Sequence, residues 1–493
     1  MPKSYRTLIE KYFDEHSFVE SNINSFNNFI GRELQNIVDE NREVVPTIIP
    51  PEIEDFKIRL GKIWVTKPEI VEADGSRRAI FPIEARLRNI TYSAPIFLEV
   101  STIIDGVQRE NFSTQVGKIP IMLKSNYCHL NKLKHGELIE KGEDPDDPGG
   151  YFILNGNERV LINVEDLASN KLLISENNVG PSRFTGRLFS EKGALKIPHT
   201  IEQMKDGIIY LSFTTFKRVP IIAVIKSLGL CKDEEIMKLI CEDKQYDDVF
   251  INLYGSVDLK TVDQAQEFIG KSVGLTISKE DKLARIQERL DRYLLPHLGT
   301  DKESRMIKAY NLCKHIKKFL MVSRDGVGLD DKDHYMNKRL KLSGDLLADL
   351  FRVNLRILVG DMLYNFQRLV KRGKFHSTKT IIREKLLTSR IKSAMATGSW
   401  VGARSGVTQN IDRTNFLSSQ SHLQRVVSLL SATQENFEAR ALHCTHFGRL
   451  CPVETPEGTP IGLRKNLAML TNISHEDLGI EKIKKILEAN GLK

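Results

Sequence analysis

The hydrophobic pattern of this chain changes period several times along its length, and this change constrains the fold more than any other feature. Residues 5–40 carry apolar side chains at helical spacing, including Phe26, Phe29, Ile30 and Leu34. From residue 56 the chain is instead rich in β-branched and aromatic residues separated by short turn signals, which predicts strands. We therefore expect an α+β multidomain fold with mixed helices and antiparallel sheets.

Later parts of the chain repeat this alternation. The stretch "GYFILNGNERVLINVED" is predicted to form two strands joined at Asn155-Gly156, because both residues tolerate the positive φ of a tight turn. Residues 182–225 are predicted to form further strands, and residues 232–320 helices. A second helical region begins near residue 340, is expected to end near Gly373, and places one broad apolar face at positions 347, 350, 351, 355 and 358.

The length of 493 residues exceeds what one hydrophobic core usually supports, so we expect roughly two to four domains. The six cysteines are scattered without a CxxC pair, and the amino-terminal residues are too charged for a signal peptide. No apolar run approaches the roughly 18 residues that span a bilayer. These features predict a cytoplasmic location and no membrane partner.

Positive charge is concentrated in residues 371–434, which we call the basic segment. It contains eleven Lys and Arg against two acids, Glu384 and Asp412, and this excess accounts for the whole net charge of +8. A concentrated positive field attracts a polyanion, and counterion release from phosphates makes nucleic acid the natural candidate. The alternative is a solvated basic face without a ligand.

Residues 396–428 of the basic segment combine glycines with hydrogen-bond donors. Three glycines are expected to allow close backbone approach: Gly398, Gly402 and Gly406. Three arginines offer forked donors that match phosphate oxygens: Arg404, Arg413 and Arg425. Neutral donors are added by Gln409, Asn410, Asn415, Ser418, Ser421 and His422. This composition suits a surface that follows a nucleic-acid backbone without reading its sequence.

The stretch "CPVETPEGTPIG" (451–462) follows closely, and we call it the proline corner. Pro456 suits the second position of a turn and Gly458 its fourth, while Pro452 and Pro460 favour extended residues before them. A stiff corner is expected here. It would hold neighbouring side chains in fixed directions, as accurate binding by the basic segment requires.

Two loops have competing functional interpretations. The acids of residues 140–150 could bind a metal, but carboxylates on a loop without fixed ligand geometry are mostly solvated. The stretch "AQEFIGKS" (265–272) ends like a phosphate-binding loop, although Ala265 replaces the first glycine and Gly270 is better explained as a helix cap.

A third pattern gathers residue types that bind zinc: His443, Cys444, His446 and Cys451. Their spacing does not match the usual structural zinc sites, and we expect packed, hydrogen-bonded residues and no metal site.

Three long motifs occur in the second half of the chain: "DDKDHYMNKRLKLSGDLLADLF", "ARSGVTQNIDRTNFLSSQSHLQRVVS" and "FEARALHCTHFGRLCPVETPEGTPIGLRKNLAML". Their sequences and order resemble the second-largest subunit of multisubunit DNA-dependent RNA polymerases, and the likeness runs from about residue 20 to the carboxy terminus. The chain is similar to the amino-terminal half of a split subunit, the archaeal B″ subunit, which pairs with a separate B′ chain. A truncated longer chain is the alternative.

The resemblance implies a domain layout of protrusion, lobe and fork. Residues 1–175 and 321–370 correspond to the protrusion, 176–320 to the lobe, 371–470 to the fork, and 471–493 to the start of the external region and the carboxy-terminal end. The fork of this family bears on the DNA–RNA hybrid and the downstream edge of the transcription bubble. The basic segment is therefore expected to lie there.

The resemblance also implies which residues act. The expected nucleic-acid contacts are Arg404, Gln409, Arg413, His422, Arg425 and Arg440. Supporting roles are expected for Asp412, His443, His446, Glu454 and Glu457. The catalytic aspartates of this family hold Mg²⁺ in the largest subunit, and this sequence contains no DFDGD-like run. We therefore expect no catalytic residue and no bound cofactor in this chain, with Mg²⁺ in the assembled enzyme.

The leading hypothesis is a non-catalytic core subunit of DNA-directed RNA polymerase that positions the DNA template, the DNA–RNA hybrid and downstream DNA. Its partners would be a B′ chain, the largest-subunit chains, other polymerase subunits, template DNA and nascent RNA. One alternative is an autonomous nucleic-acid-binding protein, which the basic segment alone supports. Another is a metal-dependent hydrolase built on the histidine and cysteine group, which predicts stoichiometric zinc.

Overall fold

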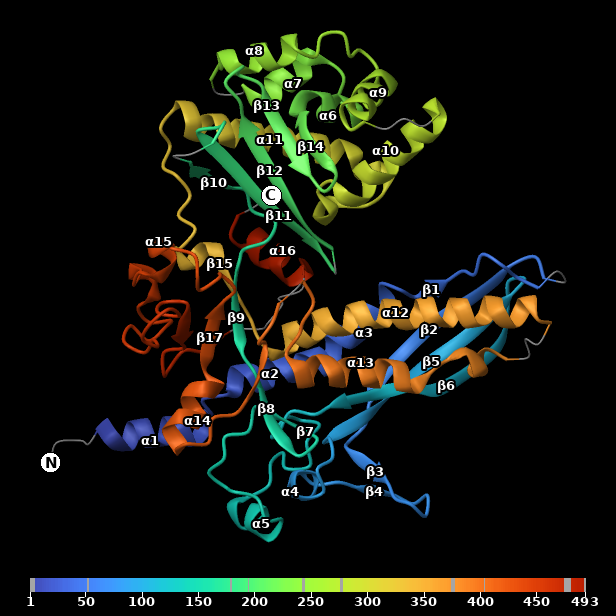
Figure 1. Cartoon of the computed structure of the whole chain (residues 1–493), viewed down its shortest axis with the longest axis vertical. Coiled ribbons are helices and arrows are strands. Elements are labelled where there is room, and N and C mark those ends of the chain that lie inside the picture. The colour runs from blue at the N-terminus through green and yellow to red at the C-terminus, as the bar shows by residue number, and fades with distance from the viewer. Residues whose placement is uncertain are drawn as a thin grey trace. The chain divides into compact units, whose positions relative to one another are not determined.

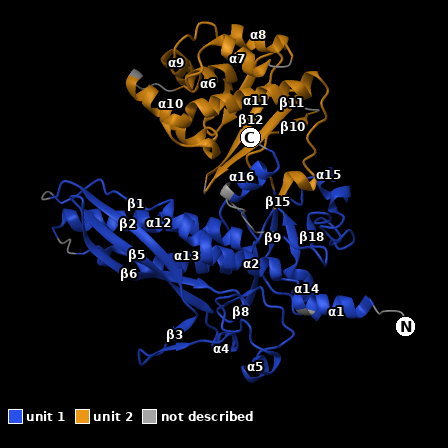
Figure 2. Cartoon of the chain, turned by 180° about the vertical axis from the view of Figure 1, so that it is seen from behind, with its two compact units in different colours: residues 1–166, 340–493 blue, residues 167–339 orange. Residues whose placement is uncertain are grey.

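The computed structural model describes residues 5–50, 53–177, 180–193, 195–241, 244–274, 278–373, 377–402, 404–473 and 480–491. Figure 2 shows the chain divided into two compact units. Unit 1 comprises residues 1–166 and 340–493, and unit 2 comprises residues 167–339. Each unit has its own hydrophobic core, so the fold is multidomain α+β as expected. No helix in the described part of the chain combines the length and apolarity that crossing a membrane requires.

Unit 1 is built on a four-stranded antiparallel sheet in the order β1-β2-β5-β6. Its strands are β1 (Glu43–Val44), β2 (Phe56–Val65), β5 (Ser93–Ile104) and β6 (Val107–Pro120). Along β2, buried and half-buried residues largely alternate, because successive side chains of a strand lie on opposite faces of the sheet. This confirms the strands predicted from the β-branched and aromatic pattern.

Helices from two distant parts of the sequence pack on this sheet and on one another (Figure 1). They are α2 (Glu20–Asn28), a π-helical turn (Phe29–Glu33), α3 (Leu34–Asp39), α12 (Ser343–Lys371) and α13 (Glu384–Thr397). Helix α1 (Tyr5–Glu15) comes before them, and its residues 5–12 are exposed. Helix α13 packs against β6, α3 against β2, and α12 against α2. The predicted apolar face of α12 is buried, and Gly373 follows the helix with φ of 63°, so both predictions are confirmed.

Two smaller sheets attach the basic segment to unit 1. Strands β7 (Phe152–Leu154) and β8 (Asn157–Leu161) form the predicted hairpin, and β16 (Thr408–Asn410) pairs with β8. The other sheet has the order β15-β9-β17-β18, made of β15 (Lys338–Lys341), β9 (Asn163–Leu167), β17 (Arg425–Ser428) and β18 (Arg464–Asn466). The chain leaves unit 1 through β9 and returns through β15, its neighbour in this sheet.

The remaining elements of unit 1 are short. They are β3 (Glu69–Val71), β4 (Arg77–Ala79), α4 (Pro82–Leu87), α5 (His135–Glu140), α14 (Phe416–Leu423), α15 (Phe437–Arg440) and α16 (Ile480–Ala489). Helix α4 corrects the prediction of continuous strand character between β4 and β5. Pro82 occupies the first turn of this helix, where its missing N–H costs no hydrogen bond.

Unit 2 combines a five-stranded antiparallel sheet with six α-helices in its described residues. The sheet order follows the sequence: β10 (Leu173–Glu176), β11 (Phe184–Lys192), β12 (Leu195–Gln203), β13 (Ile209–Phe213) and β14 (Phe216–Pro220). The helices are α6 (Ile221–Ser227), α7 (Asp233–Ile240), α8 (Asp247–Tyr254), α9 (Val262–Ser272), α10 (Lys279–Tyr293) and α11 (Arg305–Arg324). The expected change from strands to helices is confirmed, and the expected lobe (176–320) lies within this unit.

Two local predictions in unit 2 are wrong. Residues 221–225 form the buried helix α6 and do not continue the strands. Gly270 lies inside α9 and is not its cap. A Cβ at this glycine would lie 2.7 Å from Cδ of Lys282, so the glycine allows α9 to pack closely on α10. Because "AQEFIGKS" lies entirely within α9, it does not form a glycine-rich phosphate loop.

Candidate nucleic-acid interface

The backbone of β8 holds the first half of the 396–428 stretch in place. The N–H of Ile162 donates to the carbonyl of Val407 at 2.9 Å, and the N–H of Ile411 donates to the carbonyl of Glu158 at 3.1 Å. A Cβ at Gly398 would lie 3.0 Å from the carbonyl oxygen of Thr408, so this glycine lets two backbone segments of the protein pack closely.

Gly402 and Gly406 serve a different purpose from Gly398. Both have positive φ, 79° and 72°, but a Cβ at either position would meet no atom within 4 Å. No other part of the described protein approaches these two glycines closely, and close approach by a ligand stays a prediction. They are turn residues, chosen because L-residues rarely adopt this backbone conformation.

His422 organises the loop that carries Gln409 and Asp412. Its Nδ1 accepts the backbone N–H of Asp412 at 3.0 Å, so the ring proton must lie on Nε2, which faces Oε1 of Gln409 at 3.1 Å. The amide nitrogen of Gln409 in turn donates to the carbonyl of Gly406 at 3.1 Å. His422 is only 4% exposed, so it positions this loop and does not present its ring to a ligand.

The electrostatic surroundings keep His422 neutral. Burial lowers its pKa to about 4, and the positive charges of Arg425 and Arg464 act in the same direction. Asp412 is fixed nearby, because its carboxylate accepts the backbone N–H of Thr414 at 3.0 Å and its hydroxyl at 2.8 Å. These hydrogen bonds, the backbone one first, lower the pKa of Asp412.

Arg413 is held by acidic residues from a distant part of unit 1. Its Nε donates to Glu158 at 2.8 Å and its Nη2 to Asp147 at 3.0 Å. The guanidinium also lies 5.0 Å from the ring centre of Tyr151. Two carboxylates therefore already neutralise this arginine, although its side chain is 41% exposed.

A second arginine completes the same network. Arg86 donates to Glu158 at 2.8 Å, to Glu143 at 2.8 Å and to the hydroxyl of Tyr151 at 2.9 Å. Glu143 and Asp147 belong to the acidic loop 140–150, which was considered as a metal site from the sequence. In the structure these two carboxylates bind arginine and tyrosine side chains, so they hold the loop against α4 and β8.

Arg404 and Arg440 also have internal partners. Nη2 of Arg404 lies 3.1 Å from Asp166, and both side chains are largely buried. Arg440 donates to the carbonyls of Thr459 at 2.6 Å and Ile461 at 3.0 Å, and its other nitrogen donates to those of Ala432 and Gln434. Arg440 thus links the end of the proline corner to residues 432–434 through hydrogen bonds.

The proline corner is closed by Thr455. Its hydroxyl donates to the carbonyl of Arg464 at 3.0 Å and accepts the N–H of Gly462 at 2.9 Å. Gly462 has φ of 70°, and a Cβ there would lie 2.3 Å from the carbonyl oxygen of Arg440. A cavity of about 170 Å³ remains behind the corner, lined partly by Arg440, Glu454 and Lys465. These contacts fix the backbone at Thr455 and Gly462, and the stiffness of the whole corner stays a prediction.

Arg425 differs from the other arginines of the basic segment. It begins β17, is half-buried, and its guanidinium has no hydrogen bond or ion pair among the described residues. Arg464 on β18 is exposed and also lacks such a partner within the described ranges. The nearby carboxylate of Glu454 accepts a hydrogen bond from the hydroxyl of Ser421.

The histidine and cysteine group does not converge. Cys444 is exposed, His446 is buried, and Nδ1 of His443 accepts the backbone N–H of Thr445 at 3.1 Å. No three or more His, Cys, Asp or Glu side chains in the described part of the chain are arranged to hold a metal ion. Glu457, the last expected supporting residue, is exposed on the proline corner.

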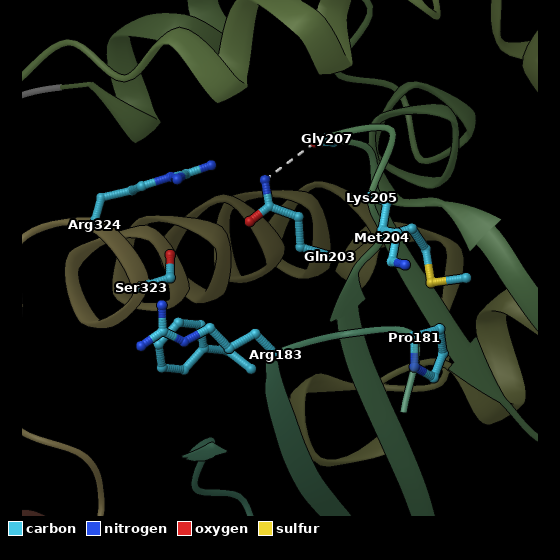
Figure 3. Close-up of a pocket in the computed structure, with 9 residues that line it drawn as sticks. Pro181, Arg183, Gln203, Met204, Lys205, Gly207, Ser323 and Arg324 are labelled. Atoms are coloured by element: carbon cyan, nitrogen blue, oxygen red, sulfur yellow. Dashed lines mark hydrogen bonds between the residues drawn. The ribbon is translucent and has the colours of Figure 1, made fainter. Parts of the chain in front are cut away.

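Unit 2 contains a separate pocket of about 270 Å³ (Figure 3). Arg183 and Arg324 line it, but each already has an acidic partner. Arg324 binds both oxygens of Asp248 at 2.6 and 2.7 Å, and Arg183 lies 2.8 Å from Glu176. Because these charges are compensated, we do not place the nucleic-acid site in this pocket.

Several participating residues lie outside the predicted set. Arg464 lies beyond the basic segment. The sequence signal that could have found it is the strand "RKN" after the proline corner, in which Lys465 faces inward to Glu165 and Arg464 faces outward. Glu158 and Asp147 gave no local signal, because their partner Arg413 is more than two hundred residues away in the sequence.

Comparisons with known proteins agree with these features. The family model described as RNA polymerase beta subunit matches residues 17–389, and the model for RNA polymerase Rpb2, domain 3, matches residues 409–473. The chain is 42% identical over 470 residues to the DNA-directed RNA polymerase subunit Rpo2 of Saccharolobus solfataricus, which covers 95% of this chain and 41% of that protein.

Two other relatives match over nearly their whole length. Subunit Rpo2N of Methanocaldococcus jannaschii is 40% identical over 496 residues, 99% of each chain. Subunit Rpo2N of Halobacterium salinarum is 39% identical over 500 residues, 99% of this chain and 96% of that one. The chain thus spans about two fifths of the length of its Rpo2 relatives. It belongs to the RNA polymerase beta subunit family.

Proposed function

We propose that this chain is a non-catalytic core subunit of DNA-directed RNA polymerase, which positions template DNA, the DNA–RNA hybrid and downstream DNA. The observation that carries this proposal is the acid-poor basic segment, whose strands β16 and β17 pair with β8 and β9 and which keeps Arg425 without a partner among the described residues. Family membership supplies the assembly in which such a surface works. By the same family resemblance, Mg²⁺ would be held by the largest subunit of the assembly.

We also propose that the chain is the amino-terminal half of a split subunit, equivalent to archaeal B″, and that its direct partner is a B′ chain. Large apolar side chains are exposed around the fork residues, including Phe437 at 82%, Val453 at 83% and Leu470 at 65%. Exposed apolar groups of this kind favour burial by another polypeptide. They therefore support a subunit of an assembly over an autonomous nucleic-acid-binding protein.

Reconstitution with site-specific crosslinking tests the proposal. A photoreactive phenylalanine at Phe416, which is exposed on α14 next to Arg413, should crosslink to nucleic acid in an assembled transcribing polymerase. The same group at exposed Tyr364 on α12 serves as the control. The purified chain alone should make no RNA. Equal crosslinking from both positions, or a stable chain that ignores B′ and the largest subunit, would contradict the proposal.

A further inference from the structure

Arg425 and Arg464 are diagonal neighbours on one face of a strand pair. In the antiparallel pairing of β17 with β18, Arg425 lies opposite Asn466, and Val427 lies opposite Arg464. Paired residues share a face of the sheet, and so do residues two positions apart on one strand. Both arginines therefore lie on the same face, with their Cα atoms roughly 7–8 Å apart as diagonal neighbours. Their neighbours Val426 and Lys465 occupy the other face and are 1% and 7% exposed.

No protein group compensates this pair directly. Across the described ranges, neither guanidinium has a hydrogen bond or an ion pair, whereas Arg404, Arg413 and Arg440 all do. Buried or half-buried arginines normally have partners, because an uncompensated charge away from water is costly. A ligand that supplies the negative countercharge would explain why the protein keeps Arg425 uncompensated.

The two arginines also act on each other. Burial lowers the pKa of Arg425, and the positive charge of Arg464 lowers it further, while Glu454 and Asp412 oppose the shift. The remaining titratable neighbour, His422, is neutral near pH 7. Two cations therefore share one face, and the two carboxylates that act on Arg425 each accept hydrogen bonds elsewhere: Glu454 from Ser421, and Asp412 from Thr414. Such a costly arrangement is typical of a binding site.

We propose that Arg425 and Arg464 together bind one phosphodiester group of the nucleic-acid backbone, and that Glu454 limits the affinity of this site. The forked donors of two arginines match the oxygens of a phosphate. The inference rests on the proposed function, because the assembly must bring nucleic acid to this face.

Binding measurements on the reconstituted polymerase test this pair. The probe is a fluorescent DNA–RNA hybrid scaffold, titrated at several salt concentrations against Arg425→Ala, Arg464→Ala and the double variant. Each single variant should weaken binding roughly tenfold and reduce the salt slope by roughly 0.7–0.9. The double variant should lose little more than either single variant, because both arginines hold the same phosphate. Glu454→Gln should instead tighten binding.

A matched control removes a positive charge elsewhere in unit 1. Arg109 on β6 is exposed, and Arg109→Ala should leave the affinity and the salt slope unchanged. Suppose that the wild-type polymerase binds the hybrid tightly and that Arg464→Ala binds it equally well. In that case the proposal that Arg425 and Arg464 share a phosphate is wrong, and the proposed function stands. If the wild-type polymerase does not bind the hybrid, both are wrong.

Competition with tripolyphosphate distinguishes the two sources of phosphate. If the hybrid is the ligand, tripolyphosphate should displace it only weakly, and equally from wild type and Arg464→Ala. Strong displacement from wild type that Arg464→Ala abolishes would assign the pair to a nucleoside triphosphate and overturn the phosphodiester assignment.

Discussion

Arg413 and Arg425 belong to the same acid-poor segment, yet their surroundings are opposite. Arg413 is held by two carboxylates and lies over an aromatic ring. Arg425 has no such partner in the described part of the chain and shares its face with another arginine. Net charge therefore does not identify a binding surface, because acids from distant strands decide which arginines remain available.

The difference also separates stability from function. The network around Arg413 uses its charges to hold α4, the loop 140–150 and the basic segment together. The pair of Arg425 and Arg464 costs folding energy, which proteins tolerate at sites that bind a ligand. Substitutions around Arg413 should therefore lower the unfolding free energy, whereas substitutions of Arg425 or Arg464 should weaken nucleic-acid binding.

The largest effect is expected from Arg86→Met, which removes the arginine shared by Glu143 and Glu158. We expect unit 1 to lose about 3 kcal/mol of unfolding free energy, because the buried carboxylate of Glu143 loses its arginine and Glu158 keeps only Arg413 among its described partners. Urea unfolding followed by tryptophan fluorescence measures this in unit 1 alone, since Trp64 and Trp400 are the only tryptophans. Arg88→Met, at an exposed neighbouring arginine, should cost less than about 1 kcal/mol.

A smaller loss of unfolding free energy is expected for Gly462→Ala, which disturbs the close contact between Gly462 and the backbone of Arg440. The added Cβ would collide with the carbonyl of Arg440, and φ of 70° is unfavourable for alanine. We expect a loss of about 2–3 kcal/mol in the same unfolding experiment. Gly458→Ala is the matched control, because φ is 80° there but the space is open. Equal losses would show that backbone strain alone matters and that the Arg440 contact does not.

The next effect depends on pH and concerns His422, beside Arg425. Its pKa is lowered from about 6.5 to about 4 in the folded state, so the unfolded chain binds more protons between these values. The stability contribution of neutral His422 is complete above pH 6.5 and declines as the pH falls toward 4. His422→Gln should flatten this part of the pH profile of unit 1. An unchanged profile would mean that His422 is not kept neutral by the fold.

The smallest change in unfolding free energy is expected for Arg425→Ala, and comparing it with Arg413→Ala tests the contrast between the two arginines. Arg425→Ala should change the unfolding free energy by no more than about 0.5 kcal/mol, because its guanidinium has no hydrogen bond or ion pair to lose within the described residues. Arg413→Ala should cost about 1 kcal/mol, since its partners are lost but its side chain is partly exposed. If Arg425→Ala is the more destabilising of the two, its proposed availability to a ligand is wrong.

Local patterns predicted much of the fold. The hairpin at Asn155-Gly156, the apolar face of α12 and the change from strands to helices in unit 2 all follow from short-range rules. Helix α4 and the packing role of Gly270 were not predicted. Both depend on contacts that a local window does not contain.

The candidate site was less predictable than the fold. Sequence placed Arg425 and Glu454 in the expected set, but it could not distinguish Arg425 from Arg413 or Arg404. That distinction depends on Asp147, Glu158 and Asp166, which reach the site only through strand pairing. Arg464 was missed because charge was counted along the chain, whereas the strand pair brings it beside Arg425.

The neighbouring positions of β9 and β15 have an evolutionary consequence. Because the chain departs and comes back at adjoining strands, residues 167–339 form an insertion between two neighbouring strands, β9 and β15. A lineage could enlarge, trim or exchange that insert by recombination between these strands. The strand that carries Arg425 would keep its register throughout.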